Sequence, residues 1–571
     1  MKLKDQINSY LQKVIENITE EKAEIEIQSA QESIHGDYST NAALKIFRKA
    51  KDRFKNPLEL AKKIAEELEK ISELSSILEK AEVAAPGFIN FWLKDTALLE
   101  NLEEVIDKKE NYGKRERFKS KKIMLEFAHP NTHKLFHIGH LRNIIIGESL
   151  ARLLEFQASK VIRANYQGDV GLHVAKAVYG LQTTDYSLEE IGKKSVDEKM
   201  RLLAKAYVKG NEDYENNPKA KAEIAEINKN LYGKDQSIMD LWKKTRDWSL
   251  EYFDRIYKRA GTKFDKLYFE SEVADFGKEI VMKNLNNVFI KDQGAIIFAG
   301  EKYGLHNRVF INSLGLPTYE AKDVGLAYFQ MKDFSPNKII HVVGPEQKRY
   351  FEVLFKALEA ISNMFKNREI HLEYGFVRLK EGRMSSRKGD VVEGEWLLDE
   401  AKARLRKEFN EMNEETLEKV AVSAVKYSML KFSRTSDILF SFEESISFEG
   451  NSGPYIQYTF ARTQSVLAKV KTQNSKVKIE RQKSKLEAEE LSVLRLLVHF
   501  SEIVEEAGEN FAPNLLCNYL FELSQKFNNF YQKHKILGSD KEEFRLQLTF
   551  AAGQILKTGL YLLGIEAPSK M

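Results

Sequence analysis

The chain has 571 residues, of which 43% are hydrophobic and 30% charged, a composition typical of a globular protein with about three or four domains. Its net charge of +4 is small for this length, so it permits local nucleic-acid-binding patches without requiring them. The single cysteine, Cys517, excludes an internal disulfide and fits a reducing compartment. The N-terminus has neither the apolar core of a signal peptide nor the acid-poor character of a transit peptide, and no apolar run reaches the roughly 20 residues that span a bilayer. We therefore expect a cytoplasmic protein without a membrane segment.

Residues 123–154 predict a strand, a loop and a helix. The run Ile123–Phe127 is apolar enough for a buried strand, and apolar residues recur at helical spacing after His140. His137, Gly139 and His140 lie where the loop meets the helix. A helix N-terminus attracts phosphate, a glycine lets a base or ribose approach the backbone, and two imidazoles could hydrogen-bond the charge on departing pyrophosphate. The motif is short, and the alternative is that both histidines are ordinary loop residues.

A basic, hydroxyl-rich loop, EGRMSSRKG, runs from Glu381 to Gly389. It could clamp a phosphate, or it could be a solvated basic turn. The histidine motif followed by this loop resembles the two signatures of class I aminoacyl-tRNA synthetases, and the surrounding sequence PNTHKLFHIGHLRN resembles the arginyl-tRNA synthetase version. This resemblance implies ATP-dependent attachment of L-arginine to tRNA(Arg) through an arginyl-adenylate. AMP and pyrophosphate would be released, with Mg²⁺ assisting.

The resemblance also implies roles in ATP binding. His137 and His140 would stabilise the triphosphate, and Gly139 would make room for the adenosine. The second loop would close over the phosphates, and its ATP-binding residues would be Met384, Ser385 and Ser386.

The second loop departs from the general class I pattern K-M-S-K-S. Arg383 stands in place of the first lysine and Ser386 in place of the second. In arginyl-tRNA synthetases a lysine just before the histidine motif is thought to compensate, and Lys134 occupies that place here. The resemblance therefore leaves open whether Lys134, Arg387 or Lys388 carries the charge that meets the phosphates.

Strand-like runs alternate with helical segments between about 113 and 395, which is the pattern of a doubly wound parallel sheet. The runs are Ile123–Phe127, Val161–Tyr166, Arg308–Asn312, Lys338–Val343 and His371–Val377. Residues from about 176 to 260 are charged and helical in pattern, so we expect a helical insertion. The predicted fold class is α/β, with a Rossmann-like parallel-sheet catalytic domain at 113–395. An N-terminal α+β domain at 1–112 would precede it, and an all-α domain at 396–571, which resembles the family's anticodon-binding domain, would follow.

Selecting arginine requires anions in a pocket, because a guanidinium is a rigid fork of donors. Tyr319 and Asp323 are four residues apart at the start of an expected helix, so they share a face. Glu270 follows a strand-like run, and Gln347 follows another. Each alone could be a solvated residue or a helix cap. The positions matching these four in arginyl-tRNA synthetases surround the substrate side chain, and the position of Asn131 holds its amino-acid end, so the resemblance implies that all five bind arginine.

Phe88 and Asn90 share one face of an expected strand in the N-terminal module. An exposed aromatic beside an amide would stack on an RNA base and hydrogen-bond its edge, whereas the alternative is a core phenylalanine with a surface asparagine. The module, including GDYSTNAA and APGFIN, resembles the additional domain of arginyl-tRNA synthetases. That resemblance implies contact with the D-loop side of tRNA.

Tyr455, Tyr458 and Arg462 lie on one face of the expected helix Gly453–Lys471. The face is suited to stacking and phosphate contact, and equally to packing against another helix. The resemblance implies that the end of the chain, at Met571, packs near the anticodon.

These features indicate a monomeric, cytoplasmic member of the arginyl-tRNA synthetase family without a metal site of its own. Among related enzymes, a glutamate pocket is disfavoured by Glu270 with Asp323, and a zinc-dependent cysteine pocket by the single cysteine. An inactive, tRNA-binding relative is a second alternative. The intact histidine motif disfavours it, while the altered phosphate loop keeps it open.

Overall fold

The structure, a computed structural model, describes residues 3–20, 25–29, 35–184, 187–380, 392–471 and 485–571. The chain folds into two compact units. The first consists of Met1–Gly113, Arg462–Ile503 and Glu522–Thr558. The second consists of Lys114–Ala461, Val504–Phe521 and Gly559–Met571.

A five-stranded parallel sheet organises the second unit, with strand order β12-β11-β5-β6-β7. Its strands are β5 (Lys122–Glu126), β6 (Lys160–Gln167), β7 (Lys266–Phe269), β11 (Lys338–Val343) and β12 (Glu369–Glu373). Apolar side chains such as Met124, Ile162 and Ile339 are buried because helices cover the sheet. The predicted doubly wound α/β architecture is confirmed, and the carboxyl ends of these strands are where ligands bind in such sheets.

Helices α6 (Ile138–Phe156), α12 (Glu270–Lys283), α13 (Tyr319–Phe334) and α14 (Lys348–Ile361) follow strands of this sheet or pack around it. Helices α12 and α13 pack closely because Gly277 and Gly325 lie at their crossing. A Cβ at Gly277 would overlap the carbonyl oxygen of Ala321. The first turns of α12 and α13 therefore lie close together, near the carboxyl ends of the strands of the parallel sheet.

The expectation that Arg308–Asn312 belongs to the parallel sheet is wrong. This run forms β10 (Arg308–Ile311) in a separate antiparallel sheet with β9 (Ala295–Phe298) and β8 (Phe289–Asp292). Gln293 and Gly294 both have positive φ and close a tight hairpin between β8 and β9. A short apolar run does not reveal which sheet it joins, so periodicity alone misplaced it.

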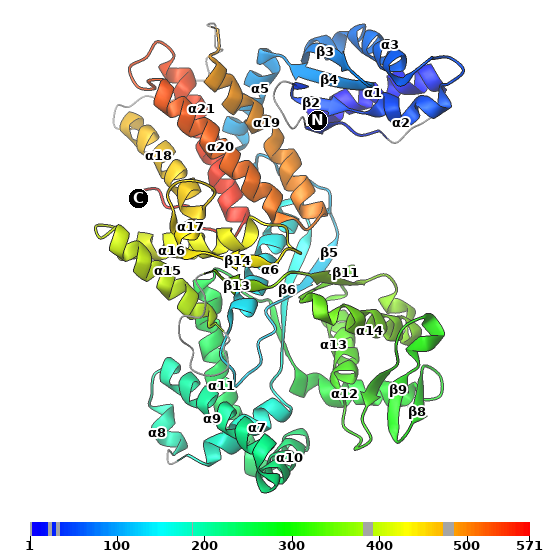
Figure 1. Cartoon of the computed structure of the whole chain (residues 1–571), viewed down its shortest axis with the longest axis vertical. Helices are drawn as coiled ribbons and strands as arrows, with labels where there is room; N and C mark the ends of the chain where they lie inside the picture. The colour runs from blue at the N-terminus through cyan, green and yellow to red at the C-terminus, as the bar shows by residue number, and fades with distance from the viewer. Residues whose placement is uncertain (1–2, 21–24, 30–34, 185–186, 381–391, 472–484) are drawn as a thin grey trace. The chain divides into compact units, whose positions relative to one another are not determined.

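The segment predicted as a helical insertion is helical and forms one group in Figure 1. Its helices are α7 (Leu172–Gln182), α8 (Leu188–Gly192), α9 (Val196–Asn216), α10 (Pro218–Tyr232) and α11 (Gln236–Arg259). Serine caps α8 and α9 through capping boxes at Ser187 and Ser195.

The N-terminal part of the first unit is an α+β module built on an antiparallel sheet of order β1-β2-β4-β3. The strands are β1 (Gln28–Ser29), β2 (Tyr38–Thr40), β3 (Leu78–Ala84) and β4 (Phe88–Leu93). The helices are α1 (Leu3–Thr19), α2 (Ala42–Ile46), α3 (Pro57–Glu69), α4 (Ser72–Ser75) and α5 (Asp95–Lys108), with short 3-10 turns at Phe47–Lys49 and Lys109–Asn111. Within this unit the buried Asp37 accepts a bond from the Leu93 amide and pairs with Arg495. Asp37 of the GDYSTNAA motif thus stabilises the fold of this unit.

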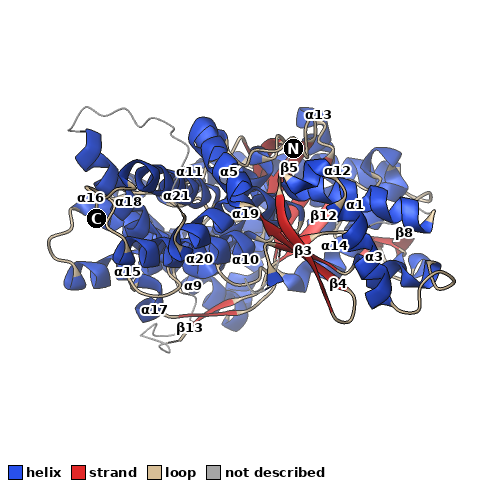
Figure 2. Cartoon of the chain, turned by 90° about the horizontal axis from the view of Figure 1, so that it is seen from above, coloured by secondary structure: helices blue, strands red, loops and turns tan. Residues whose placement is uncertain are grey.

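Helices predominate after residue 392 (Figure 2). They are α15 (Gly394–Glu408), α16 (Glu414–Leu430), α17 (Phe442–Ile446), α18 (Gly453–Lys471), α19 (Ala488–Glu509), α20 (Pro513–Lys533) and α21 (Glu542–Leu562). The expectation of an exclusively helical region is wrong at one point, because β14 (Ile438–Phe440) pairs in parallel with β13 (Val377–Leu379). In the described part of the chain, no helix is long and apolar enough to cross a membrane.

Candidate active site

The two histidines of the H-x-G-H motif cap helix α6 reciprocally. His137 is the N-cap residue, and its Nδ1 accepts bonds from the backbone N–H of Gly139 at 3.1 Å and of His140 at 3.3 Å. The backbone N–H of His137 donates to Nδ1 of His140 at 3.2 Å. The two rings stack with their centroids 3.5 Å apart. Imidazole nitrogens therefore do what serine and glutamate do in an ordinary capping box.

This capping fixes the tautomer of both rings. Each Nδ1 accepts a backbone hydrogen bond, so in a neutral ring the proton is on Nε2, which is left as a donor. Burial and then the nearby Lys134 ammonium lower the pKa of His137 to about 4. Burial, His137, His129 and Lys134 lower the pKa of His140 well below its usual value. Both rings are therefore neutral donors at pH 7.

The geometry revises the expected use of the helix N-terminus. The first amides of α6 are already bonded, since Ile138 donates to the Val392 carbonyl at 2.8 Å and His137 takes the next two. A phosphate at this helix end would therefore meet imidazole Nε2–H groups rather than free backbone amides. Gly139 also has a local function, because a Cβ there would lie 2.9 Å from Cε1 of His137. The cap itself requires the glycine.

Lys134 lies beside this motif and is the charge that lowers the pKa of His137 after burial. Its ammonium is 4.7 Å from the centre of the Tyr207 ring on α9 of the helical insertion. The other predicted phosphate contacts, Arg383, Met384, Ser385, Ser386, Arg387 and Lys388, lie outside the described residues. Among the predicted basic groups within the described ranges, Lys134 is the one next to the histidines.

Asn131 and Glu270 both approach Gly168, just beyond the carboxyl end of β6. A Cβ at Gly168 would overlap Oδ1 of Asn131 and lie 3.3 Å from Oε1 of Glu270. Asn131 also forms a parallel bridge with Gly168. Asn131 comes from the loop after β5 and Glu270 from the first turn of α12, so the sheet brings together two residues 139 positions apart.

Glu270 is paired with a lysine that the sequence reading did not single out. Nζ of Lys322 lies 2.5 Å from Oε2 of Glu270, with side-chain exposures of 4% and 7%. The Tyr319 ring covers this ammonium at 4.7 Å and the Tyr232 ring at 5.6 Å. Burial alone would lower the pKa of Lys322, but the Glu270 carboxylate raises it, so the lysine stays charged. Tyr232 ends α10, so the helical insertion supplies part of this site.

Asp323 lies one residue further along α13 and has a different partner. Its Oδ2 accepts a bond from the Tyr350 hydroxyl at 2.6 Å. Burial raises the pKa of Asp323 to about 8, with Glu126 and Glu270 adding to the rise and Tyr350 and His341 opposing it. At pH 7 Asp323 is therefore mostly protonated, and a cation placed beside it would favour its ionised form.

The fifth predicted arginine-binding residue, Gln347, lies in the 3-10 turn Pro345–Gln347 after β11, the strand that pairs with β5 in the sheet. Tyr319 is present but 62% exposed at the rim. The structure thus brings Glu270 and Tyr319 against Lys322, with Asn131 near Glu270 at Gly168 and Asp323 next to Lys322 on the same helix.

Comparison with known proteins decides the family. The family described as "tRNA synthetases class I (R), catalytic domain" matches residues 101–442. The "Arginyl tRNA synthetase N terminal domain" matches residues 1–93, and the "DALR anticodon binding domain" matches 456–571. The arginine–tRNA ligase of Fusobacterium nucleatum is 33% identical over 99% of both chains, and that of Clostridioides difficile is 32% identical over 99% of both. The chain belongs to the arginyl-tRNA synthetase family.

Solved structures agree on the fold. The arginyl-tRNA synthetase of Thermus thermophilus superposes with a TM-score of 0.81 at 24% identity, covering 100% of both chains. That of Plasmodium falciparum gives 0.79 at 22% identity, covering 100% of this chain and 99% of the other. Aminoacylation of tRNA(Arg) is the known reaction of the family.

Two buried residues whose side chains bond loops around the candidate site, His133 and Asp169, are not among the residues predicted from the sequence. His133 donates or accepts through both ring nitrogens, to Thr132 at 2.9 Å and Thr245 at 2.8 Å, and so ties the loop before the H-x-G-H motif to α11. Asp169 accepts two bonds from Ser271, at 2.9 and 2.7 Å, and lies 2.9 Å from Nε of Arg246. A charged residue two positions after a β-strand is a usable signal for Asp169, whereas nothing in the sequence pattern distinguishes His133.

Of the expected RNA-stacking pair, Phe88 is exposed and Asn90 is not. Phe88 is 37% exposed at the start of β4. Asn90 is 5% exposed, and its Oδ1 accepts a bond from the Ser39 hydroxyl at 2.8 Å. The expectation of an exposed amide at Asn90 is therefore wrong, because the side chain is buried opposite Ser39 of β2, whose hydroxyl bonds it.

Tyr455, Tyr458 and Arg462 on α18 differ in their surroundings. Within the second unit, Tyr455 packs edge-on against Phe521 with ring centres 5.7 Å apart, while Tyr458 is 39% exposed. Within the first unit, Arg462 donates to Asn528 and lies 4.9 Å from the Tyr531 ring. Helix packing thus occupies Tyr455 and Arg462, and Tyr458 is the most exposed of the three. Met571 is partly buried at the end of the chain.

Proposed function

We propose that the chain attaches L-arginine to tRNA(Arg) in an ATP-dependent reaction, at the site formed by the strand ends of the parallel sheet. The observation that carries this proposal is the pair of carboxylates, Glu270 and Asp323, at the same sheet edge as the capped H-x-G-H motif. Two buried acids suit a cationic amino acid, and a neighbouring set of neutral imidazole donors suits a triphosphate. Family membership supports the same reaction.

In the activation step the arginine carboxylate attacks the α-phosphate of ATP, forming arginyl-adenylate and releasing pyrophosphate. The Nε2–H groups of His137 and His140 bond the phosphate oxygens, and Lys134 supplies positive charge from the same side. The loop carrying Met384, Ser385, Ser386, Arg387 and Lys388 adds further contacts to the triphosphate. Mg²⁺ would enter with ATP as part of the substrate, held mainly by the phosphate oxygens.

Asn131 holds the amino-acid end of arginine, and the carboxylates of Glu270 and Asp323 face the side-chain end. Tyr319 closes the rim, and Gln347 contacts the substrate from the turn after β11. Lys322 pairs with Glu270 and fixes the position of that carboxylate, while Asp323 has no cationic partner among the contacts described above and is the carboxylate proposed to pair with the guanidinium, whose rigid fork of donors a lysine ammonium lacks.

The tRNA contacts fall outside the small-molecule site. Phe88 offers an exposed ring for stacking, with Asn90 supporting the strand beneath it, and Tyr458 offers a second exposed ring. Tyr455 and Arg462 hold α18 in place, and Met571 contributes at the anticodon side. We assign 1–112 to tRNA D-loop contact, 113–395 to catalysis and 396–571 to anticodon binding, in a cytoplasmic monomer.

The decisive experiment is amino-acid-dependent ATP–pyrophosphate exchange, run with and without total tRNA and with each of the twenty amino acids. Exchange with arginine, and with arginine alone, is the expected result. Exchange with another amino acid would keep the fold and change the substrate. Intact tRNA binding without exchange under any condition would instead favour the inactive, tRNA-binding relative.

Replacing Phe88 with Ala should raise the KM for tRNA several-fold, because an exposed stacking surface worth about 1–3 kcal/mol is lost. The KM values for ATP and arginine should not change. Replacing the exposed Val208 of the insertion with Ala is the matched control, since Val208 is 53% exposed and lies elsewhere. Equal tRNA kinetics for the Phe88 and Val208 variants would remove Phe88 from the tRNA contact.

A further inference from the structure

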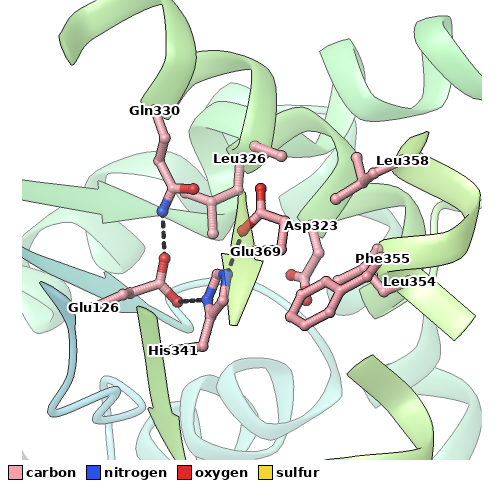
Figure 3. Close-up of a pocket in the computed structure, with 10 residues that line it drawn as sticks. Glu126, Asp323, Leu326, Gln330, His341, Leu354, Phe355, Leu358 and Glu369 are labelled. Carbon is pink, nitrogen blue, oxygen red and sulfur yellow. Dashed lines mark hydrogen bonds and ion pairs between the residues drawn. The ribbon is translucent and has the colours of Figure 1, made fainter. Parts of the chain in front are cut away.

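Beneath the arginine site lies a buried chain of charged groups that the reaction scheme does not use. His341 of β11 bonds Glu126 of β5 through Nδ1 at 3.0 Å and Glu369 of β12 through Nε2 at 2.8 Å. Gln330 donates to the other oxygen of Glu126. Figure 3 shows the imidazole between the two carboxylates, and Glu126, Glu369 and His341 are each no more than 7% exposed at the side chain.

The bonding pattern determines the charge of this chain. A carboxylate only accepts, so both nitrogens of His341 must donate, and the ring is an imidazolium. Burial alone would lower the pKa of His341, but Glu126 and Glu369 raise it to about 10. The three groups together carry one net negative charge, and without His341 they would carry two.

Asp323 faces this chain across a cavity of about 10 Å³, which is about the space for one water molecule. The cavity is lined by Asp323, His341, Glu126 and Glu369 on its polar side, and by Leu326, Leu354, Phe355 and Leu358 on its apolar side (Figure 3). Asp323 is therefore the point at which the buried charges reach the arginine site.

We propose that His341 is a positioning residue for arginine binding, whose imidazolium offsets the buried carboxylates and so allows Asp323 to ionise when a guanidinium arrives. The inference rests on the proposed function, in which Asp323 binds the arginine side chain. The charge on His341 opposes the effect of Glu126 on Asp323, and both are fixed by neighbouring strands in register. The imidazolium itself makes no contact with the substrate.

Other titratable groups also face His341 and Asp323. His341 is faced by His129 after β5 and by His371 on β12, and Asp323 by Tyr350 on α14, Glu270 on α12, Tyr166 on β6 and Tyr319 on its own helix. Tyr350 donates to Asp323 and favours the ionised form, while Glu270 disfavours it.

The test is the pH dependence of the arginine KM in ATP–pyrophosphate exchange between pH 6.5 and 8.5, for the full chain with tRNA. In the wild type the KM should fall as the pH rises, because arginine binds the ionised form of Asp323. His341→Gln should move this dependence toward higher pH and raise the KM at pH 7 by about tenfold for each unit added to the pKa of Asp323, with little change in kcat. Glu126→Gln removes a negative charge from the same chain and should move the dependence toward lower pH.

His371→Gln is the matched control, since His371 pairs in register with His341 on the next strand but has neither carboxylate partner. Coincident profiles for His341→Gln and His371→Gln would overturn the proposal, and so would shifts of the same sign for His341→Gln and Glu126→Gln, which mark general damage to the core. If His341→Gln fails to fold, Glu126→Gln alone tests the proposal. In that variant, a pH dependence of the arginine KM that is unchanged or moved toward higher pH would contradict it. Failure of wild-type exchange with arginine would instead contradict the proposed function.

Discussion

The two halves of the candidate site satisfy their own polar groups by different means. In the half proposed to bind arginine, buried charges are paired, with Lys322 against Glu270 and His341 against Glu126 and Glu369. In the half proposed to bind ATP, the neutral rings of His137 and His140 bond the backbone of their own helix. The first half is held by buried ions, whose removal leaves an unpaired charge, and the second by hydrogen bonds and stacking. Substitutions should therefore have larger effects in the first half than in the second.

The largest effect is expected for Lys322→Met, which leaves Glu270 buried without its cation. The free energy of unfolding should fall by about 3–5 kcal/mol, as in other broken buried pairs. Lys332→Met is the control, because Lys332 is an exposed lysine on the same helix. Denaturant unfolding measures both.

The double variant Lys322→Met with Glu270→Gln isolates the pair. Removing both charges should restore much of the stability lost in the single variant, giving a coupling energy of opposite sign to the loss. Additive losses in the double variant would show that the two side chains do not act as a pair.

Asp323→Ala should act on binding rather than on folding. We expect the arginine KM to rise by the equivalent of about 2–5 kcal/mol, since a guanidinium would lose a desolvated carboxylate, while the KM for ATP stays near its wild-type value. Asp333→Ala at the far end of α13 serves as control. An arginine KM equal to that of the control would remove Asp323 from the pocket.

The sequence predicted the parallel sheet well because its strands are short apolar runs separated by helical periodicity. Lys338–Val343 was predicted to the residue, whereas Arg308–Asn312 was assigned to the wrong sheet, since strand order is a long-range property. In the site, motif residues such as His137 and Asp323 were predictable from their spacing and resemblance. Lys322 was not, because only the packing of α13 against α12 turns it toward Glu270.

The buried chain of Glu126, His341 and Glu369 shows the same limit. Each residue stands in a strand and resembles an ordinary polar position, and the three meet only because β5, β11 and β12 are neighbours. Asn90 illustrates the converse error. A period of two places Asn90 on the same face as Phe88, but alternation does not show which residues of that face are buried.

At the ATP half, Gly139→Ala should have a moderate effect. The new Cβ would lie 2.9 and 3.0 Å from ring atoms of His137, so the ring must move and the cap must loosen, at a cost of about 1–3 kcal/mol. We expect the loosened cap to lower kcat/KM for ATP in the exchange reaction. Gly192→Ala is the control, since a Cβ there meets nothing within 4 Å. Equal ATP kinetics in the two variants would show that the histidine cap tolerates the displacement.

The response to pH separates the two halves most directly. The pKa of His137 lies near 4 in the folded chain against an ordinary 6.5, so below pH 6.5 the unfolded chain binds a proton that the folded chain does not. Stability should therefore fall as the pH drops from 6.5 toward 4, and His137→Asn, which can still cap α6, should reduce that slope by about one proton.

The pKa of His341 is raised to about 10, so the stability that its charged form contributes is present below pH 6.5 and is lost as the pH rises toward 10. His341→Gln should accordingly flatten the alkaline side of the curve and His137→Asn the acidic side, as measured by denaturant unfolding from pH 4.5 to 9.5. Flattening of the same side by both variants would show that the two halves are not stabilised differently.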